Sequence, residues 1–247
     1  MEIHAPNTLK DKPRRFPSLN PSDIHVWVCA AESSTIENSE LSLLPVDEIA
    51  HARKVESKLQ RCQYVRGRIL LRQVLSLYLL CAPEEVQFRC NRHGKPSLKG
   101  RSYNIRFNLT HSDRLVLIAV VLGGFVGIDT EILRDRNDLG EVARQLFSAN
   151  EFKLLPDGAV KTRKDLFYRF WTGKEACVKA VGTKITDLGL KRIDLSRASK
   201  KQSIFRVKPG LYLKWFTPVP GFVAAIARNT RPKNIRLLRW SDSEFKS

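Results

Sequence analysis

The feature that most constrains the fold is an almost unbroken apolar stretch, Leu115–Ile128. It contains a Gly-Gly pair and is followed by Asp129. A helix that crosses a bilayer needs about 20 apolar residues, so this stretch is too short to span a membrane. Its β-branched residues and its central glycines instead predict a hairpin of two strands, 115–122 and 125–131.

The segments on either side repeat a similar order of elements. Alternation and helical spacing of apolar residues predict, in chain order, a strand at 24–30, helices over 45–80, strands at 86–88 and 105–110, helices over 138–182 in two pieces, and short strands over 188–239. This order favours an α+β fold of two pseudo-symmetric lobes, each a helix on a small antiparallel sheet, with the active site in the cleft between them. The expected divisions are an extended N-terminal arm (1–22), an N-terminal lobe (23–123) and a C-terminal lobe with a basic tail (124–247).

Charge and cysteine content narrow the class of protein. The chain has 43 Lys and Arg against 25 Asp and Glu, a formal net charge of +18, while 43% hydrophobic residues exclude wholesale disorder. The positive charge indicates an anionic partner but leaves nucleic acid, phosphorylated metabolites, acidic proteins and anionic membranes open. Five scattered cysteines without a CxxC pair, and an N-terminus without an apolar signal-peptide core, predict a soluble, non-secreted, cytoplasmic protein.

Two acidic residues follow the apolar stretch. Asp129 and Glu131 lie two apart at the end of a predicted strand, so their carboxylates share one face. Converging carboxylates repel each other unless a cation joins them, and Mg²⁺ prefers such oxygen ligands. The pair alone is equally consistent with a solvated strand end.

The predicted helix 169–182 carries a second group of polar residues. Trp171, Glu175 and Lys179 are spaced four apart and therefore fall on one helical stripe, with Lys174 beside them. A surface Glu–Lys pair would explain this spacing equally well. If Glu175 instead joins the two strand carboxylates as a third oxygen ligand, Lys179 would balance the charge of a bound phosphate.

Further residues are suited to binding phosphate oxygens. They are the hydroxyl and imidazole groups of Thr110, His111 and Ser112, the turn lysine Lys95 beside Pro96, and the helical arginines Arg61, Arg66, Arg68 and Arg72. Each has an ordinary alternative, namely a turn residue, a solvated loop lysine or a solvated basic helix face.

The order of these motifs is more specific than any one of them. Over Arg61–Gly182 the series R-x₄-R, GKP, FNLTHS, GIDTE and FWTGKEACVKAVG resembles the 4′-phosphopantetheinyl transferase superfamily, in particular its two-lobed, surfactin-synthetase-activating branch. The resemblance implies transfer of 4′-phosphopantetheine from coenzyme A to a serine of an apo carrier protein, with adenosine 3′,5′-bisphosphate as the second product.

The resemblance also implies a role for individual residues. The metal ligands would be Asp129, Glu131 and Glu175 around Mg²⁺, and the catalytic residues Glu175, Lys179 and Asp129. The coenzyme A ligands would be Arg61, Arg66, Lys95, Pro96, Thr110, His111, Lys174 and Lys179. We hypothesise that Glu175, directly or through a metal-bound water, removes the serine proton. Thr110 stands where the commoner motif has serine, and it keeps the hydroxyl.

The expected partners follow from this resemblance. They are coenzyme A and an acidic acyl or peptidyl carrier protein, with no membrane, and one chain that holds both lobes predicts a monomer. The alternative from another class is a basic nucleic-acid-binding protein, favoured by Phe205, Tyr212, Trp215 and Phe216 among basic residues. No recognised nucleic-acid motif accompanies these aromatic residues.

Overall fold

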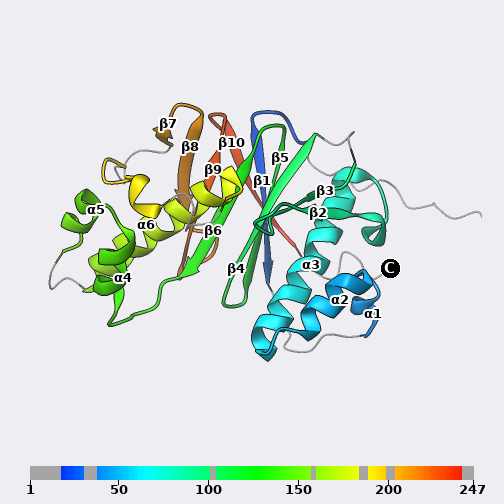
Figure 1. Cartoon of the computed structure of the whole chain (residues 1–247). Helices are drawn as coiled ribbons and strands as arrows, with labels where there is room; N and C mark the ends of the chain where they lie inside the picture. The colour runs from blue at the N-terminus through cyan, green and yellow to red at the C-terminus, as the bar shows by residue number, and fades with distance from the viewer. Residues whose placement is uncertain are drawn as a thin grey trace, which may run out of the picture.

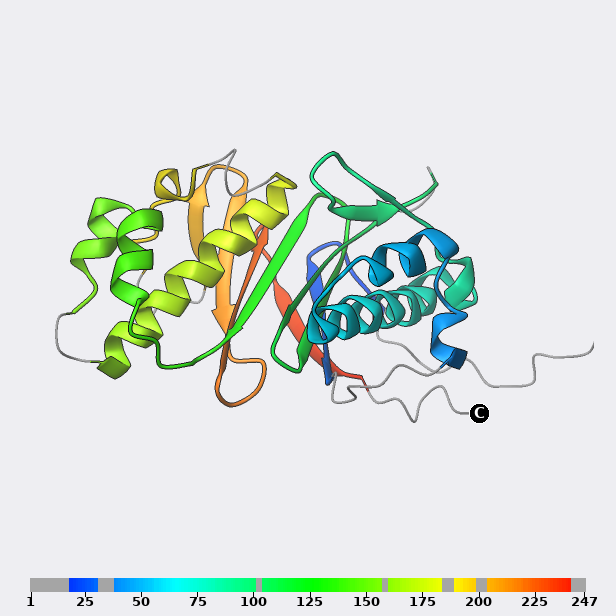
Figure 2. The same ribbon diagram turned by 60° about the horizontal axis from the view of Figure 1, so that its bottom comes forward.

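Two four-stranded sheets lie face to face at the centre of the molecule, and one long helix covers the outer face of each (Figures 1 and 2). The computed structural model describes residues 18–30, 38–100, 104–156, 160–183, 189–198 and 204–240. The arrangement confirms the predicted α+β fold of two lobes. Within the described ranges, no helix has the length and apolar character needed to cross a membrane.

The first sheet has the strand order β10-β1-β5-β4. The 22-residue helix α3 packs on its outer face, where Val74 and Leu75 share a buried cluster with Trp27 and Ile118. The elements of this half are β1 (Asp23–Ala30), α1 (Asn38–Leu41), α2 (Val46–Arg53), α3 (Lys58–Leu79), η1 (Pro83–Glu85), β2 (Phe88–Cys90), β3 (Pro96–Leu98), β4 (Ile105–Ser112) and β5 (Leu115–Leu122).

The second sheet has the order β6-β9-β8-β7, and all of its pairs are antiparallel. Helix α6 packs on its outer face through residues such as Phe170 and Ala176, against Leu213 and Ala225. The elements of this half are β6 (Val126–Ile132), α4 (Leu139–Leu146), α5 (Ala149–Lys153), α6 (Val160–Val181), η2 (Leu190–Arg192), β7 (Phe205–Lys208), β8 (Leu211–Phe216), β9 (Phe222–Arg228) and β10 (Asn234–Arg239).

The inner faces of the two sheets form a core of their own. Val26 and Leu117 of the first sheet share a buried cluster with Ile128 and Ile226 of the second. Strand β5 is therefore covered by α3 on one face and by the second sheet on the other. A strand buried on both faces has no solvent side to carry polar residues, which explains the unbroken apolar run of 115–122.

The predicted hairpin of 115–122 and 125–131 is wrong. β5 pairs with β1 and β4 in the first sheet, whereas β6 pairs with β9 in the second. Gly123 and Gly124 have φ values of +65° and +66°, a conformation that glycine adopts without strain. Their turn carries the chain from one sheet to the other, and this crossing joins the two lobes.

The last strand also departs from the prediction, which placed all of 124–247 in the C-terminal lobe. β10 instead pairs with β1, in parallel, and extends the first sheet. Trp240, just after β10, packs edge-on against Trp27 at 5.7 Å between ring centroids. Burial of this aromatic surface favours the pairing of β10 with β1. Most of the predicted N-terminal arm lies outside the described residues, although Leu19 packs against the first core.

The contact between α6 and β6 depends on a glycine. A Cβ atom built on Gly127 would lie 2.1 Å from the Ala176 carbonyl oxygen and 2.2 Å from the Ala180 amide nitrogen. Both are backbone atoms, so the Gly127→Ala substitution would force helix and strand apart, and we expect it to lower the unfolding free energy by about 3 kcal/mol in urea titrations.

Gly67 provides the matched control for this substitution. It lies inside α3, and its added Cβ would meet Leu109 methyl groups at 3.6 Å, an ordinary contact. Gly67→Ala should leave stability unchanged or raise it by about 0.5–1 kcal/mol, because alanine is the better helix former. Equal stability of the two variants would show that the helix–strand approach is not tight.

Candidate active site

The two sheets meet at a seam between β4 and β6, and alternate side chains of β4 bridge it. The Asn108 side-chain oxygen accepts from the Ile128 amide at 2.8 Å, and the Thr110 hydroxyl donates to Asp129 at 3.0 Å. The Ser112 hydroxyl donates to the Glu131 carboxylate at 2.8 Å and accepts from the Ile132 amide at 3.1 Å. These bonds fix the register of the seam and orient both acidic side chains of β6.

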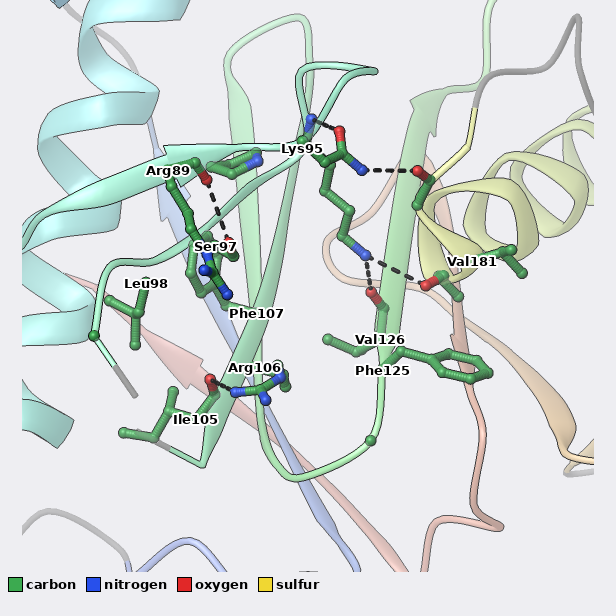
Figure 3. A pocket seen from close by; sticks show the side chains of 16 residues that line it. Arg89, Lys95, Ser97, Leu98, Ile105, Arg106, Phe107, Phe125, Val126 and Val181 are labelled. Atoms are coloured by element: carbon green, nitrogen blue, oxygen red, sulfur yellow. Dashed lines mark hydrogen bonds between the residues drawn. The ribbon is translucent and has the colours of Figure 1, made fainter. Parts of the chain in front are cut away.

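Three cavities follow one another along this seam. The hairpin cavity, about 510 Å³, lies between the β2–β3 hairpin, the starts of β4 and β6, and the end of α6 (Figure 3). The acid cavity, about 310 Å³, is lined by Leu109, Thr110, His111, Asp129, Glu131, Trp171, Glu175 and Lys179. The aromatic cavity, about 510 Å³, is lined by residues including Leu59, Gln63, Ser112, Glu131, Phe167, Tyr168 and Trp171.

Helix α6 contributes to all three cavities in turn. Tyr168 and Trp171 reach the aromatic cavity, Glu175 and Lys179 the acid cavity, and Val181 the hairpin cavity. At 1.5 Å per residue, the helix runs about 20 Å along the seam between Tyr168 and Val181. The site is therefore an elongated groove whose charged centre lies between two larger pockets.

The charged centre holds three carboxylates and one ammonium group. The Lys179 Nζ donates to Asp129 Oδ1 at 2.6 Å and to the Thr110 hydroxyl at 3.2 Å. The Asp129 and Glu175 side chains are buried, whereas Glu131 is half-buried. One lysine thus faces three acids, and its single charge cannot neutralise all of them.

Burial raises the pKa of each acid, and the charge of Asp129 raises the pKa of Glu131 and Glu175 further. For Glu175 the pKa rises to about 7, first through burial and then through the charge of Asp129. Burial likewise raises the pKa of Asp129, against the lowering effect of Lys179, and the pKa of Glu131, against that of Ser112. A carboxylate with a pKa near 7 is suited to accept a proton at neutral pH.

The donor chemistry of this centre fits a hard divalent cation. The buried Asp129 Oδ2 has no hydrogen-bond partner in the described part of the chain, and Glu131 and Glu175 line the same cavity. As the side chains stand, however, no three Asp, Glu, His or Cys residues of the described ranges are grouped to hold a metal ion. The oxygen donors are therefore present, although they are not arranged as a closed set of ligands.

The predicted phosphate-binding residues divide between two cavities. Thr110 and His111 line the acid cavity beside Lys179, whereas Lys95 and Pro96 line the hairpin cavity. The Lys95 side chain points from the hairpin towards β6 and α6, and its Nζ donates to backbone carbonyl oxygens there (Figure 3). Burial lowers the pKa of Lys95 to about 8.

Lys174, which was predicted to bind coenzyme A, lines none of the three cavities. Its side chain is fully buried beneath α6 and has no exposed surface. The Nζ donates to the Leu190 and Ile193 carbonyl oxygens at 2.6 and 2.5 Å and pairs with the Glu151 carboxylate at 2.8 Å. Lys174 precedes Glu175 in the helix but points into the core, because neighbouring helical residues are rotated by about 100°.

The predicted arginine ligands lie apart from the three cavities. Arg61 donates to the Val55 carbonyl oxygen at 2.7 and 3.0 Å, and Arg66 pairs with Glu40. Neither side chain lines any of the three cavities, so their assignment to coenzyme A stays a prediction.

The other two arginines of α3 have packing partners. Arg68 and Arg72 both bind Glu48, and both guanidinium groups lie over the Phe88 ring, at 4.6 and 4.9 Å from its centroid. They hold α2 and the β2–β3 hairpin against α3, so this part of the basic helix face is structural.

The sequence alone did not single out several residues that line the groove. Arg89 and Arg106 are exposed, and their side chains reach into the hairpin cavity (Figure 3). Asn108, which bridges the seam, was also missed, and the available signal was the polar residue at every second position of β4. Nothing in the local sequence distinguishes the two arginines from other surface cations.

Comparison with known proteins gives a consistent result. Residues 125–227 match the family described as the 4′-phosphopantetheinyl transferase superfamily, and residues 33–122 match the N-terminal family of 4′-phosphopantetheinyl transferases. The 4′-phosphopantetheinyl transferase HetI of a Nostoc species is 32% identical over 213 residues, which cover 85% of this chain and 89% of the relative. Gsp of Aneurinibacillus migulanus is 34% identical over 116 residues (47% and 46% covered), and Sfp of Bacillus subtilis 29% over 116 residues (47% and 50%).

Proposed function

Because the chain belongs to the 4′-phosphopantetheinyl transferase superfamily, we propose that it moves 4′-phosphopantetheine from coenzyme A to a serine of an apo carrier protein. The observation that carries this proposal is the position of the three carboxylates and Lys179 at the middle of an elongated groove. Coenzyme A is a long molecule with a pyrophosphate near its centre, and the groove has its charged centre between two larger pockets.

The charges along the groove suggest how coenzyme A is oriented. The hairpin cavity offers the exposed guanidinium groups of Arg89 and Arg106, which suit the phosphorylated nucleotide end. Thr110, His111 and Lys179 then face the pyrophosphate in the acid cavity. The pantetheine arm and the incoming serine lie towards the aromatic cavity, whose Trp171 and Phe167 offer apolar surface.

The residues at the centre account for the proton and the leaving group. The carrier serine oxygen attacks the phosphorus that bears pantetheine, and its proton passes to the Glu175 carboxylate. The bond between this phosphorus and the bridging pyrophosphate oxygen breaks, and adenosine 3′,5′-bisphosphate leaves. The Lys179 ammonium group stabilises the charge on the departing phosphate or protonates it.

A divalent cation, proposed to be Mg²⁺, would be held by Asp129, Glu131 and Glu175. When bound, it would neutralise charge on the pyrophosphate oxygens and on the three acids. The unpartnered Asp129 oxygen and the raised pKa values of all three carboxylates support this assignment.

Magnesium is expected to stabilise the fold even without coenzyme A. At 100 times its dissociation constant, a cation that binds only the folded state adds about 2.7 kcal/mol, or roughly 5–10 °C of melting temperature for a chain of this size. Thermal melts with MgCl₂, against NaCl of equal ionic strength, measure this shift. It should shrink in Glu131→Gln and persist in Asp135→Asn, an exposed carboxylate outside the acid cavity. Equal shifts in both variants would place the cation elsewhere.

The transfer itself has a direct test. The protein is incubated with coenzyme A, Mg²⁺ and a panel of apo acyl and peptidyl carrier proteins, and each carrier is weighed by mass spectrometry. A gain of one phosphopantetheine group supports the proposal and identifies the carrier class. Retardation of DNA in a gel, without any transfer, would support the nucleic-acid alternative instead.

The setting of the reaction completes the proposal. We infer a monomeric cytoplasmic enzyme, because the first sheet and α6 of one chain supply both walls of the groove, and the five cysteines, all within the described residues, form no disulfide bond. The charge of +18 would attract both coenzyme A and an acidic carrier, so transfer should slow as salt is added.

A further inference from the structure

The turn of the β2–β3 hairpin contacts the end of α6, across the boundary between the two lobes. The Lys95 Nζ donates to the Lys179 carbonyl oxygen at 2.5 Å, to that of Val126 at 3.0 Å and to that of Ala180 at 3.4 Å. An ammonium group has three hydrogens, so these three acceptors use its full donor capacity.

The acceptors explain why a cation lies here. Lys179 and Ala180 belong to the last turn of α6, which ends at Val181 before Gly182, and carbonyl oxygens in a last turn lack helical donors. The C-terminus of a helix also carries partial negative charge, which a lysine stabilises. Lys95 thus caps a helix of the other lobe.

Asn91 forms the second part of the same contact. Its side-chain oxygen accepts from the His93 and Lys95 amides, both at 2.9 Å, which shapes the turn that presents Lys95. Its amide nitrogen donates to the Gly182 carbonyl oxygen at 2.8 Å, just beyond the helix end. We call Asn91 and Lys95 the helix latch.

The latch lies against the elements that carry the charged centre. Lys179 offers its carbonyl oxygen to Lys95 while its own Nζ binds Asp129, and Val126 lies three residues before Asp129 on β6. One ammonium group therefore sets the distance between the end of α6 and the start of β6.

We propose that Lys95, together with Asn91, is a positioning residue that holds Lys179 and α6 in place against β6, and that it is not a ligand of the coenzyme A phosphates. The kinetic part of this inference rests on the proposed function, whereas its structural part does not. The exposed cations that remain for phosphate in the hairpin cavity are Arg89 and Arg106.

The test compares Lys95→Met and Asn91→Ala with Arg89→Met, an exposed cation on the same cavity. Loss of a positioning contact should lower kcat by about tenfold in the two latch variants, with the KM for coenzyme A within about twofold of wild type. The preference for coenzyme A over 3′-dephospho-coenzyme A should survive in both. In Arg89→Met the KM should rise instead.

Amide hydrogen exchange provides a readout that needs no activity. Exchange at the end of α6, residues 179–183, should become about tenfold faster in both latch variants and stay unchanged in Arg89→Met. Lys95→Arg, which keeps the charge and several donors, should restore slow exchange. If Lys95→Met does not fold, Asn91→Ala and Lys95→Arg carry the same comparison.

Two results would overturn the inference. One is loss of the preference for the 3′-phosphate in Lys95→Met with unchanged exchange in α6, which would make Lys95 a phosphate ligand within an intact transferase. The other is unchanged exchange in both latch variants. If the wild-type protein transfers nothing, the proposed function fails, and exchange still decides whether the latch exists.

Discussion

Replacement of Glu175 by glutamine is expected to lower the rate of phosphopantetheine transfer by about 10²–10⁴-fold, the usual contribution of a general base. Glutamine has nearly the same shape but cannot take the serine proton at neutral pH. The pKa of Glu175 is raised to about 7 by burial and by the neighbouring charge of Asp129, so the ionised side chain is disfavoured in the fold. Removal of its charge should therefore leave the melting temperature of the metal-free protein unchanged or higher.

A lower transfer rate without a lower melting temperature would separate a catalytic role of Glu175 from a structural one. Mass spectrometry of the carrier gives the rate at saturating Mg²⁺, and thermal melts of the metal-free protein give stability. Asp165→Asn is the matched control, since Asp165 lies on the same helix and lines none of the three cavities. Turnover near the wild-type rate in Glu175→Gln would show that another group accepts the proton.

Replacement of Lys174 by methionine is expected to lower the unfolding free energy by about 3–5 kcal/mol, or roughly 6–20 °C in melting temperature. The substitution leaves the Glu151 carboxylate fully buried without its cation, although the Leu195 and Ser148 amides still donate to it at 2.8 and 2.7 Å. It also removes the lysine donor from the Leu190 and Ile193 carbonyl oxygens. Urea titration measures the loss.

Two further variants test the cause of this loss. The double variant Lys174→Met/Glu151→Gln should recover part of the stability, because a neutral amide can still accept from the Leu195 amide. Lys164→Met removes a lysine of the same helix whose partner Asp135 is mostly exposed, and it should leave stability nearly unchanged. For folded Lys174→Met the KM for coenzyme A should match wild type. A raised KM with unchanged stability would restore Lys174 as a ligand.

Hydrophobic periodicity and residue type were enough to identify most of the helices and strands, and the residue types that form the charged centre. The spacing of Trp171, Glu175 and Lys179 depends only on helical geometry, and the structure places all three in one cavity. The same argument failed for Lys174, because sequence spacing does not say which side of a helix faces the core. Only the contacts with Glu151 and the 190–193 carbonyl groups decide that.

Contacts between segments far apart in the chain decided the remaining features of the fold. The sequence by itself determined the α+β class, the two long helices and the pair of acids on one face of a strand, since each depends on residues close together in the chain. Tertiary structure alone decided that β5 and β6 enter different sheets, that β10 returns to β1, and that Lys95 caps a helix 84 residues away. These contacts arise from burial of complementary surfaces between distant segments, and no local pattern encodes which distant segment will supply the partner.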